Sequence, residues 1–304
     1  MIIPFIKYSK IWLVISGLIT LFCVAFLVLW GLKPGIDFTG GSMMELSFSQ
    51  NRPSQTVIQD ALQSAGIKNQ SVQNIGDKGV LIRTEFLSES EHQAVLKIML
   101  SKLQTENSEM REERFETIGS SVSKQLKQRA VWAIFFVNLG IIVYVAYAFR
   151  KVSRPVASWK YGVLAIVALF HDVLLVMGVF AVLGRFLGVE VDTAFVVAIL
   201  TVLGYSVNDT IVVYDRIREN LIRHGSEDFS DTVNVGLNQT LMRSINTTFK
   251  TLLPLIALYF LGGHTIKYFS LALLIGIASG AYSSIFIASP LLVVVHNWKQ
   301  RRRT

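Results

Sequence analysis

Six long apolar runs set the strongest limit on how this chain can fold. They cover roughly residues 11–30, 130–149, 160–183, 193–214, 247–262 and 268–295. A helix of about 20 apolar residues spans the hydrocarbon core of a bilayer, where every backbone polar group must be satisfied within the protein. Only 16% of the residues are charged, and that shortfall lies in the runs. The sequence therefore predicts an all-α membrane bundle of six helices.

The fifth run departs from this pattern more than the others. Lys250 and Pro254 interrupt its apolar residues. Proline removes a backbone N–H, but membrane helices tolerate it where neighbouring groups satisfy the freed carbonyl. The run is still expected to span the membrane, as the least regular helix of the bundle.

Lysine and arginine gather in alternate connections between the runs. The basic connections and the tail contain Arg150, Lys151, Arg154, Lys160, Arg216, Arg218, Arg223, Lys299 and Arg301–Arg303. The intervening short connections contribute only Arg185 and Lys267. Because short basic loops remain in the cytoplasm, both termini are expected there. The net charge of +8 is then explained by topology and by contacts with anionic membrane lipid, so no nucleic-acid partner is expected.

The segment 31–125 is a long polar insert between the first two runs. Its periodicity predicts, in order, a strand at 43–48, a helix at 54–65, strands at 72–75 and 80–85, a helix at 88–104 and a strand at 114–118. Gly76-Asp77-Lys78-Gly79 suits a hairpin between the two middle strands. The order βαββαβ predicts a small α+β domain with a ferredoxin-like fold.

The predicted organisation has four parts. They are an N-terminus with the first helix at 1–30, the α+β domain at 31–125, the other five helices at 126–298 and a basic cytoplasmic tail at 299–304. Residues 215–242 are polar, with apolar side chains at helical spacing. We expect this segment to be a cytoplasmic amphipathic helix near the membrane surface, or else a plain connector.

Asp209 stands inside the fourth apolar run. An intramembrane carboxylate costs at least about 2.5–3.5 kcal/mol on insertion scales, so it must face a polar interior, pair with a cation or accept a proton. Tyr205 shares its helix face and Asn208 precedes it. Asp172, in the third run, could face the same interior. Its neighbour His171 is expected to be an ordinary interfacial side chain.

Arg243 stands where the fifth run begins. It belongs to a stretch of hydroxyl and amide side chains, including Thr247, that could line a wet cavity. One hypothesis pairs Arg243 with Asp209 in a proton or ion route. The alternative makes Arg243 a cytoplasmic anchor whose guanidinium reaches lipid phosphates.

Glycines cluster just after the first run, at Gly35, Gly40 and Gly41, around Asp37. Glycine permits a positive φ and close backbone approach, and aspartate can cap a turn. The segment lacks the Lys-Ser/Thr pair of a nucleotide phosphate loop. The pattern predicts a structural turn that joins the first helix to the α+β domain.

Small residues mark the last run. Gly276 and Gly280 lie four residues apart and are followed by Ser283 and Ser284. Such spacing allows helices to approach closely. We therefore interpret this motif as a packing surface.

The sequence offers no conventional catalytic apparatus. It has a single cysteine, Cys23, inside the first run, so no zinc-type cluster can form from cysteines. No nucleophile triad or phosphate loop stands out. We expect no catalytic residue, no cofactor and no metal site.

Several motifs together resemble one known family. The resemblance is carried by Gly35-Ile-Asp-Phe-Thr-Gly-Gly41, His171-Asp-Val173, Gly204-Tyr-Ser-Val-Asn-Asp-Thr-Ile-Val-Val-Tyr-Asp-Arg-Ile-Arg-Glu-Asn220, Gln239-Thr-Leu-Met-Arg-Ser-Ile-Asn-Thr-Thr248, Leu261-Gly-Gly263 and Tyr282-Ser-Ser-Ile-Phe-Ile-Ala-Ser289. These motifs are similar to those of the SecF family, the smaller subunits of bacterial SecDF translocation accessory complexes. The similarity runs over essentially the whole chain, and the Gly204–Asn220 signature is very specific.

The resemblance implies a fold, a location and partners. The six spans would be arranged like half of a resistance-nodulation-division transporter in the bacterial inner membrane, with 31–125 in the periplasm. The implied partners are SecD, YajC, SecYEG and unfolded preproteins. The implied function is a proton-motive-force-driven motor that helps draw preproteins out on the periplasmic side.

The resemblance also assigns a proton route. In the family, an aspartate of the fourth span and an arginine at the start of the fifth belong to it, and these positions match Asp209 and Arg243. Further side chains that could support the route are Asp172, Tyr205, Asn208 and Thr247. Lys250 departs from the Ser or Thr usual in the family, so the coupling ion is expected to be H⁺, with Na⁺ as the alternative.

Two other functions are compatible with the same six-helix pattern. The chain could be half of a small-molecule or ion transporter, with a polar ligand pocket near the middle of the membrane. It could instead be a structural assembly subunit, in which Asp209 and Arg243 would tolerate neutral replacement.

Overall fold

The computed structural model describes residues 2–50, 52–104, 109–148, 158–223 and 228–301. The basic residues Arg150, Lys151 and Arg154 and the end of the predicted tail lie outside these ranges. The chain divides into two compact units. A helical unit comprises Met1–Lys33, Trp132–Val189 and Ala194–Thr304, and a sheet unit comprises Pro34–Val131 with Glu190–Thr193.

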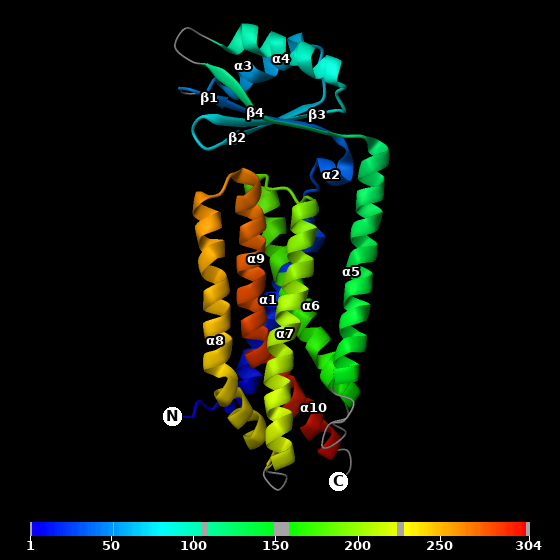
Figure 1. Ribbon diagram of the computed structural model, residues 1–304, viewed down its shortest axis with the longest axis vertical. Helices are drawn as coiled ribbons and strands as arrows, with labels where there is room; N and C mark the ends of the chain where they lie inside the picture. Colours follow the sequence, from blue (N-terminus) through cyan, green and yellow to red (C-terminus); the bar gives the residue numbers. More distant parts are fainter. Residues whose placement is uncertain (1, 51, 105–108, 149–157, 224–227, 302–304) are drawn as a thin grey trace. The chain divides into compact units, whose positions relative to one another are not determined.

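Long helices account for nearly all of the helical unit (Figure 1). They are α1 (Ser9–Trp30), α5 (Ser120–Ala148), α6 (Ser158–Leu187), α7 (Thr193–Arg223), α8 (Phe229–Leu261), α9 (His264–Ser283) and α10 (Ser289–Arg301), with a short 3-10 turn, η1 (Ile6–Tyr8), before α1 and a π-helical turn, η2 (Ser284–Ala288), between α9 and α10. Because α9, η2 and α10 form one continuous span, six helices in the described chain are long and apolar enough to cross a membrane. The predicted six-helix bundle is confirmed.

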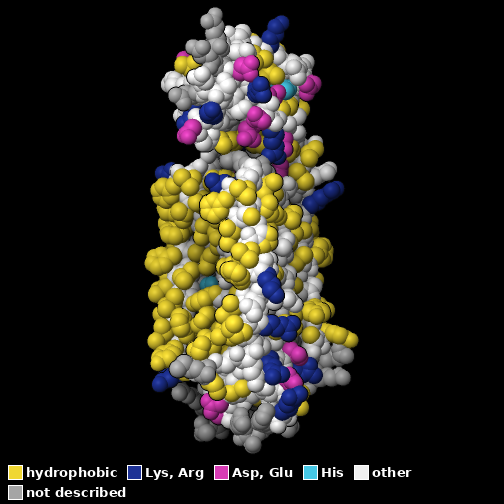
Figure 2. Space-filling model, turned by 60° about the vertical axis from the view of Figure 1, so that its left-hand side comes forward, with side chains coloured by type: hydrophobic (Ala, Val, Ile, Leu, Met, Phe, Trp, Pro, Cys, Tyr) yellow, Lys and Arg dark blue, Asp and Glu magenta, His cyan; other side chains and the backbone are white. Residues whose placement is uncertain are grey.

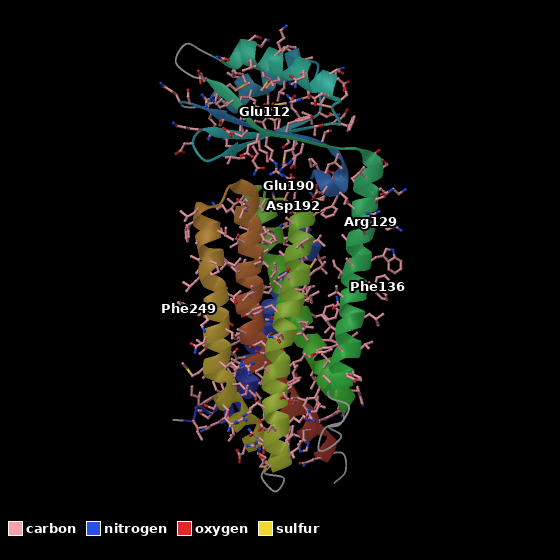
Figure 3. The ribbon with its side chains drawn as sticks, in the orientation of Figure 1. Glu112, Arg129, Phe136, Glu190, Asp192 and Phe249 are labelled. Atoms are coloured by element: carbon pink, nitrogen blue, oxygen red, sulfur yellow. The ribbon has the colours of Figure 1, made fainter. Side chains whose placement is uncertain are left out.

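Hydrophobic side chains cover the outside of the helical unit. Figure 2 shows one face on which they predominate, with charged side chains gathered toward one end. Phe136 on α5 and Phe249 on α8 are each 60% exposed and point outward (Figure 3). Apolar side chains this exposed are stable against lipid tails, which is the surface expected of a multi-pass membrane protein.

The fifth run forms a span, as predicted, and helix α8 continues unbroken through Pro254. The polar segment after the fourth run differs from the predicted surface helix. The segment 215–242 is not one surface helix, because α7 extends to Arg223 and α8 starts at Phe229. The two helix ends pack together, since a Cβ at Gly236 would lie only 2.8 Å from Ile217 Cγ1. Burial of Ile217 against that glycine explains why the polar ends stay in the bundle.

The sheet unit is a four-stranded antiparallel sheet with two helices. Its elements are β1 (Gly41–Phe48), α3 (Gln55–Ser64), β2 (Gln70–Ile75), β3 (Gly79–Thr84), α4 (Glu89–Leu103) and β4 (Met110–Ile118), with a short helix α2 (Ile36–Thr39) before them. The strand order is β2-β3-β1-β4, and every pair is antiparallel. The predicted βαββαβ ferredoxin-like domain is confirmed.

The core of the sheet unit follows from side-chain alternation. Leu46 of β1 and Ile82 of β3 are fully buried and belong to one cluster with Ile58 of α3 and Met99 of α4. Successive strand residues point to opposite faces, so one apolar face of the sheet meets both helices. That packing gives the unit a hydrophobic core of its own.

A capping box starts helix α4. The Ser88 hydroxyl accepts from the Glu91 N–H, and the Glu91 carboxylate accepts from the Ser88 N–H at 2.8 Å and from its hydroxyl at 2.7 Å. These hydrogen bonds lower the pKa of Glu91. Reciprocal bonds of this kind satisfy donors that the first helical turn leaves free.

Replacing Ser88 by alanine is expected to loosen the start of α4. Loss of a serine N-cap costs about 1 kcal/mol, so amides of 89–103 in the full-length protein should exchange hydrogen faster by about fivefold. The depressed pKa of Glu91 stabilises the fold above its unfolded pKa, and that contribution is lost as pH falls through the folded value. The difference between the two proteins should therefore shrink in acid.

The matched control for this prediction is Ser101→Ala. The Ser101 hydroxyl bonds only its own helix, at Ile98 O, and is exposed. Hydrogen exchange followed by mass spectrometry should show no change for this variant. Equal exchange in the Ser88→Ala protein and the unmodified protein would contradict the capping interpretation.

Candidate functional site

Asp209 lies in the middle of α7 and is only 7% exposed. Its carboxylate accepts hydrogen bonds from the Ser244 hydroxyl, at 2.9 and 2.8 Å, and from the Ser284 hydroxyl. Ser244 belongs to α8 and Ser284 begins η2. Three separate elements of the helical unit thus converge on one buried carboxylate, and its bound partners are neutral.

A second buried carboxylate lies on α6. Asp172 is fully buried, and its oxygens accept from the hydroxyls of Ser206 on α7, at 2.6 Å, and of Ser279 and Ser283 on α9, at 2.6 and 2.7 Å. His171 Nδ1 is 3.1 Å from the same carboxylate. The prediction that Asp172 faces a polar interior agrees with this geometry.

The two carboxylates are joined through adjacent serines. Ser283, the last residue of α9, donates to Asp172, and Ser284, the first residue of η2, donates to Asp209. A π-helical turn contains an extra residue and is often found at functional sites. Here the turn is supported by Ser289, whose hydroxyl donates to the Ser284 carbonyl at 2.9 Å.

Close packing of α9 against α7 makes these contacts possible. A Cβ at Gly276 would lie 2.2 Å from Val202 Cγ2, and one at Gly280 would lie 2.9 Å from Ser206 Cβ. The packing function of the two glycines therefore agrees with the structure. Ser283 and Ser284 were expected to do the same, but their hydroxyls instead bind carboxylates.

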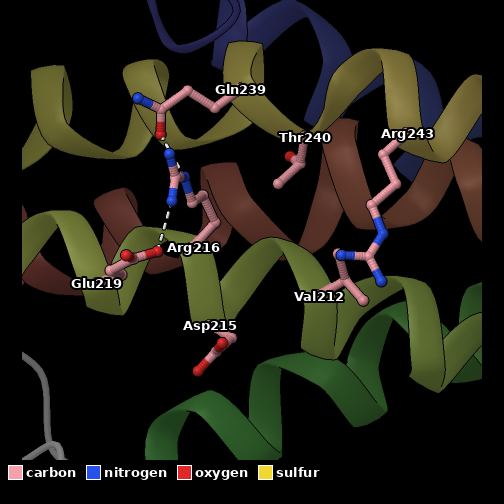
Figure 4. A pocket seen from close by; sticks show the side chains of 7 residues that line it. All are labelled: Val212, Asp215, Arg216, Glu219, Gln239, Thr240 and Arg243. Carbon is pink, nitrogen blue, oxygen red and sulfur yellow. Dashed lines mark hydrogen bonds and ion pairs between the residues drawn. The ribbon is translucent and has the colours of Figure 1, made fainter.

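Arg243 lines a polar pocket of about 270 Å³ at one end of the bundle (Figure 4). The other lining residues are Val212, Asp215, Arg216, Glu219, Gln239 and Thr240. The guanidinium extends over Val212, whereas the adjacent Ser244 faces Asp209. Among the described residues, Arg243 and Asp209 form no ion pair, so the predicted direct pairing is not what this structure contains.

The pocket is organised by a second set of contacts. Arg216 donates to Gln239 on α8 at 2.6 Å and forms an ion pair of 2.5 Å with Glu219 on its own helix. Asn220 also donates to Gln239, at 2.9 Å. These bonds tie the polar ends of α7 and α8 together around the pocket.

The remaining predicted support residues do not reach Asp209. The Tyr205 hydroxyl lies 3.5 Å from Thr251 Oγ1, and Asn208 is exposed. The Thr247 hydroxyl donates back to its own helix, at the carbonyl of Arg243. In this structure Ser244 and Ser284 bind the Asp209 carboxylate, which the sequence had led us to expect of these side chains.

The glycine-rich motif lies in the sheet unit and is structural. Asp37 accepts from the backbone N–H of Thr193, at 2.7 Å, and from its hydroxyl, at 2.6 Å. Gly35 donates to Val191 O at 2.8 Å. Gly40 and Gly41 have φ of +76° and +115°, values that residues with a side chain rarely adopt. The predicted turn therefore binds the segment 190–193 through the backbone N–H of Gly35 and the carboxylate of Asp37.

A partly buried ion pair in the same unit was not predicted from the sequence. Arg83 of β3 contacts Glu190, which Figure 3 labels. Burial lowers the pKa of Arg83, and the Glu190 charge opposes that shift. The two residues are far apart in sequence, so only the fold reveals the pair.

Nothing in the described part of the chain gathers three or more His, Cys, Asp or Glu side chains as metal ligands. The buried carboxylates and imidazole of the described helical unit are Asp172, Asp209 and His171, and serine hydroxyls surround them. Such groups bind protons or small cations.

Comparison with known families decides the relationship. The C-terminal family of SecD/SecF protein export membrane proteins matches residues 98–298, and the SecD/SecF GG motif matches residues 29–51. The chain belongs to the SecF family. Protein translocase subunit SecF of Thermobaculum terrenum is 43% identical, over 97% of this chain and 94% of that protein. The SecF subunit of a Synechocystis species is 40% identical, over 96% and 94%.

Solved structures give the same relationship. The crystal structure of SecDF, a translocon-associated membrane protein from Thermus thermophilus, superposes with a TM-score of 0.84 at 32% identity. The match covers 98% of this chain and 39% of the SecDF chain. A SecDF structure in a super-membrane-facing form gives a TM-score of 0.67 at 30% identity. This SecF-family chain therefore spans about two fifths of the SecDF chains that it matches.

Proposed function

We propose that the chain is the SecF subunit of a proton-motive-force-driven accessory complex. Together with SecD, and in contact with YajC and SecYEG, it promotes preprotein export on the periplasmic side of the bacterial inner membrane. Membership of the SecF family supports the export function. The observation that carries the proton coupling is Asp209, a carboxylate buried inside a span whose hydrogen-bond partners among the described residues are neutral hydroxyls.

The chemistry of Asp209 follows from its partners. The ionised carboxylate only accepts hydrogen bonds, so Ser244 and Ser284 both donate to it. When Asp209 binds a proton it becomes a donor, and at least one hydroxyl must turn or move away. Protonation also removes a buried charge that no described cation pairs with. Each protonation thus changes the contacts that hold α8 and η2 to α7.

The pocket beside Arg243 provides access from one side. Two residues that line the pocket are close in sequence to the carboxylate and its partner: Val212 lies one helical turn beyond Asp209 on α7, and Arg243 precedes Ser244 on α8. The basic connections on this side support a cytoplasmic position, with both termini in the cytoplasm and 31–125 in the periplasm. Arg243 would repel cations from the entrance until its side chain moves, and so would gate the route.

The test is an imposed ion gradient. The full chain is reconstituted with SecD and SecYEG in vesicles, and a preprotein is advanced part-way by SecA and ATP. Export of the remainder should accelerate when a proton gradient is imposed and stop when a protonophore collapses it. The same assay with a sodium gradient at constant pH distinguishes Na⁺ from H⁺. Export that ignores both gradients would contradict the proposal.

A further inference from the structure

His171 is the strongest unexplained group in the helical unit. The sequence predicts an ordinary interfacial side chain here, but His171 is only 5% exposed and lies inside the α6 span. Its Nδ1 contacts Asp172 at 3.1 Å. Its Nε2 is buried and has no hydrogen-bond partner among the described residues. A buried polar atom without a partner destabilises the folded state, so its presence needs an explanation.

Asp172 determines which atom of His171 carries hydrogen. A carboxylate accepts about four hydrogen bonds, and Asp172 has four partners: three serine hydroxyls and His171 Nδ1. A proton on Asp172 would displace one of them. The ionised carboxylate can accept from all four partners at once, and His171 Nδ1 is then the donor. In the neutral imidazole the lone pair is then on Nε2.

We propose that Nε2 of His171 is a second proton-binding atom in the bundle, with Asp172 as its positioning carboxylate. This inference deepens the proposed function and rests on it. Binding forms one N–H bond with a proton that the aqueous phase supplies, and release returns that proton. The imidazolium then lies against the Asp172 anion, so the pair becomes neutral overall, and Nε2 changes from an acceptor into an N–H donor.

Serine hydrogen bonds connect the second site, His171 and Asp172, to the first site, Asp209. Ser283 donates to Asp172 and the next residue, Ser284, donates to Asp209. Ser206, also bound to Asp172, lies one turn before Asp209 on α7. A change in charge at the His171–Asp172 pair therefore acts on groups that hold Asp209. Two proton sites joined in this way would bind and release protons in a dependent order.

The surroundings of His171 contain few other titratable groups. Helix α9 contributes Tyr282, whose ring centre is 6.1 Å from that of His171 and whose hydroxyl is bound to Ser16. Helix α7 contributes Asp209, beyond Ser206. Helix α1 contributes Cys23, which packs against Gly178 further along α6. Helix α10 contributes His296, which faces Phe229, and η2 has no titratable side chain.

The first test is His171→Asn in the full complex with SecD and SecYEG. The asparagine amide can keep the donor to Asp172 in place of Nδ1 but offers no group that binds a proton. Gradient-driven export should fall by about tenfold or more, within the range expected for coupled sites, while SecA- and ATP-driven export and assembly with SecD stay unchanged. His296→Gln, which removes an imidazole that faces Phe229 outside this cluster, is the matched control and should keep its gradient-driven export. Normal gradient-driven export in His171→Asn would overturn the proposal.

The second test keeps His171 itself. The chain has five histidines, so replacing His92, His224, His264 and His296 by glutamine leaves His171 as the sole source of an imidazole ¹⁵N signal. We expect the Nε2 resonance to move with pH between pH 5 and 9 while Nδ1 stays protonated. An imidazole that keeps one protonation state over this range would overturn the proposal, whatever the export assay shows. Because this measurement does not depend on export, it separates failure of the second site from failure of the proposed function.

Discussion

Replacing Asp209 by asparagine is expected to remove most of the response of export to an imposed proton gradient while the complex still assembles. Asparagine has nearly the same shape, and its amide oxygen can still accept from Ser244 and Ser284. It cannot bind or release a proton near neutral pH. Coupling free energies between sites are typically about 1–3 kcal/mol, so gradient-driven export should fall by about tenfold or more.

The matched control for this prediction is Asp231→Asn. Asp231 lies in the first turn of α8, outside the Arg243 pocket, and its side chain is exposed. This variant should retain the gradient response, because an exposed surface charge contributes little. If Asp209→Asn also kept its response to the gradient, the structural-subunit alternative would replace the proposed function. Export driven by SecA and ATP, measured in parallel, checks that both proteins are assembled.

Replacing Gly276 by alanine is expected to disturb both carboxylate sites at once. The added methyl carbon would lie 2.2 Å from Val202 Cγ2, and Val202 is itself fully buried. A stiff valine inside a close-packed interface cannot move aside freely, so the helices must separate. Overpacking of this kind typically costs about 1–3 kcal/mol. Thermal unfolding of the detergent-solubilised protein should occur at lower temperature, and gradient-driven export should fall with it.

Gly204→Ala is the control for helix propensity. Gly204 lies on α7, and nothing outside its own helix lies within 4 Å of the position where its Cβ would be. Alanine should therefore be neutral or slightly stabilising there, by at most about 1 kcal/mol. Equal stability of the Gly276→Ala and Gly204→Ala proteins would show that the α7–α9 contact is looser than the structure indicates.

The features that could be predicted from the sequence are those that depend on local patterns. A span needs only length and apolar side chains, so six runs gave six helices even where Pro254 interrupts one. The βαββαβ order followed from strand and helix periodicities along 31–125. The segment 215–242 shows the limit of such patterns. Its apolar spacing is equally compatible with a surface helix or with two helix ends, and the choice depends on the contact between Gly236 and Ile217.

Only part of the candidate site could be predicted from the sequence, for a related reason. A carboxylate such as Asp209 stands out in an apolar run because its cost is high wherever it points. A serine in a membrane helix has a low free-energy cost because its hydroxyl can bond its own backbone. Nothing in the sequence therefore marks Ser244 or Ser284 as a partner of a carboxylate. Their function depends on which helix lies opposite and on the π turn, neither of which a single sequence specifies. His171 was missed because its burial is a property of the packed bundle.

The direct succession of Ser283 and Ser284 restricts how this part of the bundle can move. Neighbouring residues of a helix point about 100° apart, so this segment is held on two faces by two different carboxylates. Turning the segment about its axis to lengthen one hydrogen bond necessarily alters the other. One rotation of this segment therefore changes the hydrogen bonds to both carboxylates. A compound that wedged against this segment and blocked its rotation would stop both sites without touching either carboxylate.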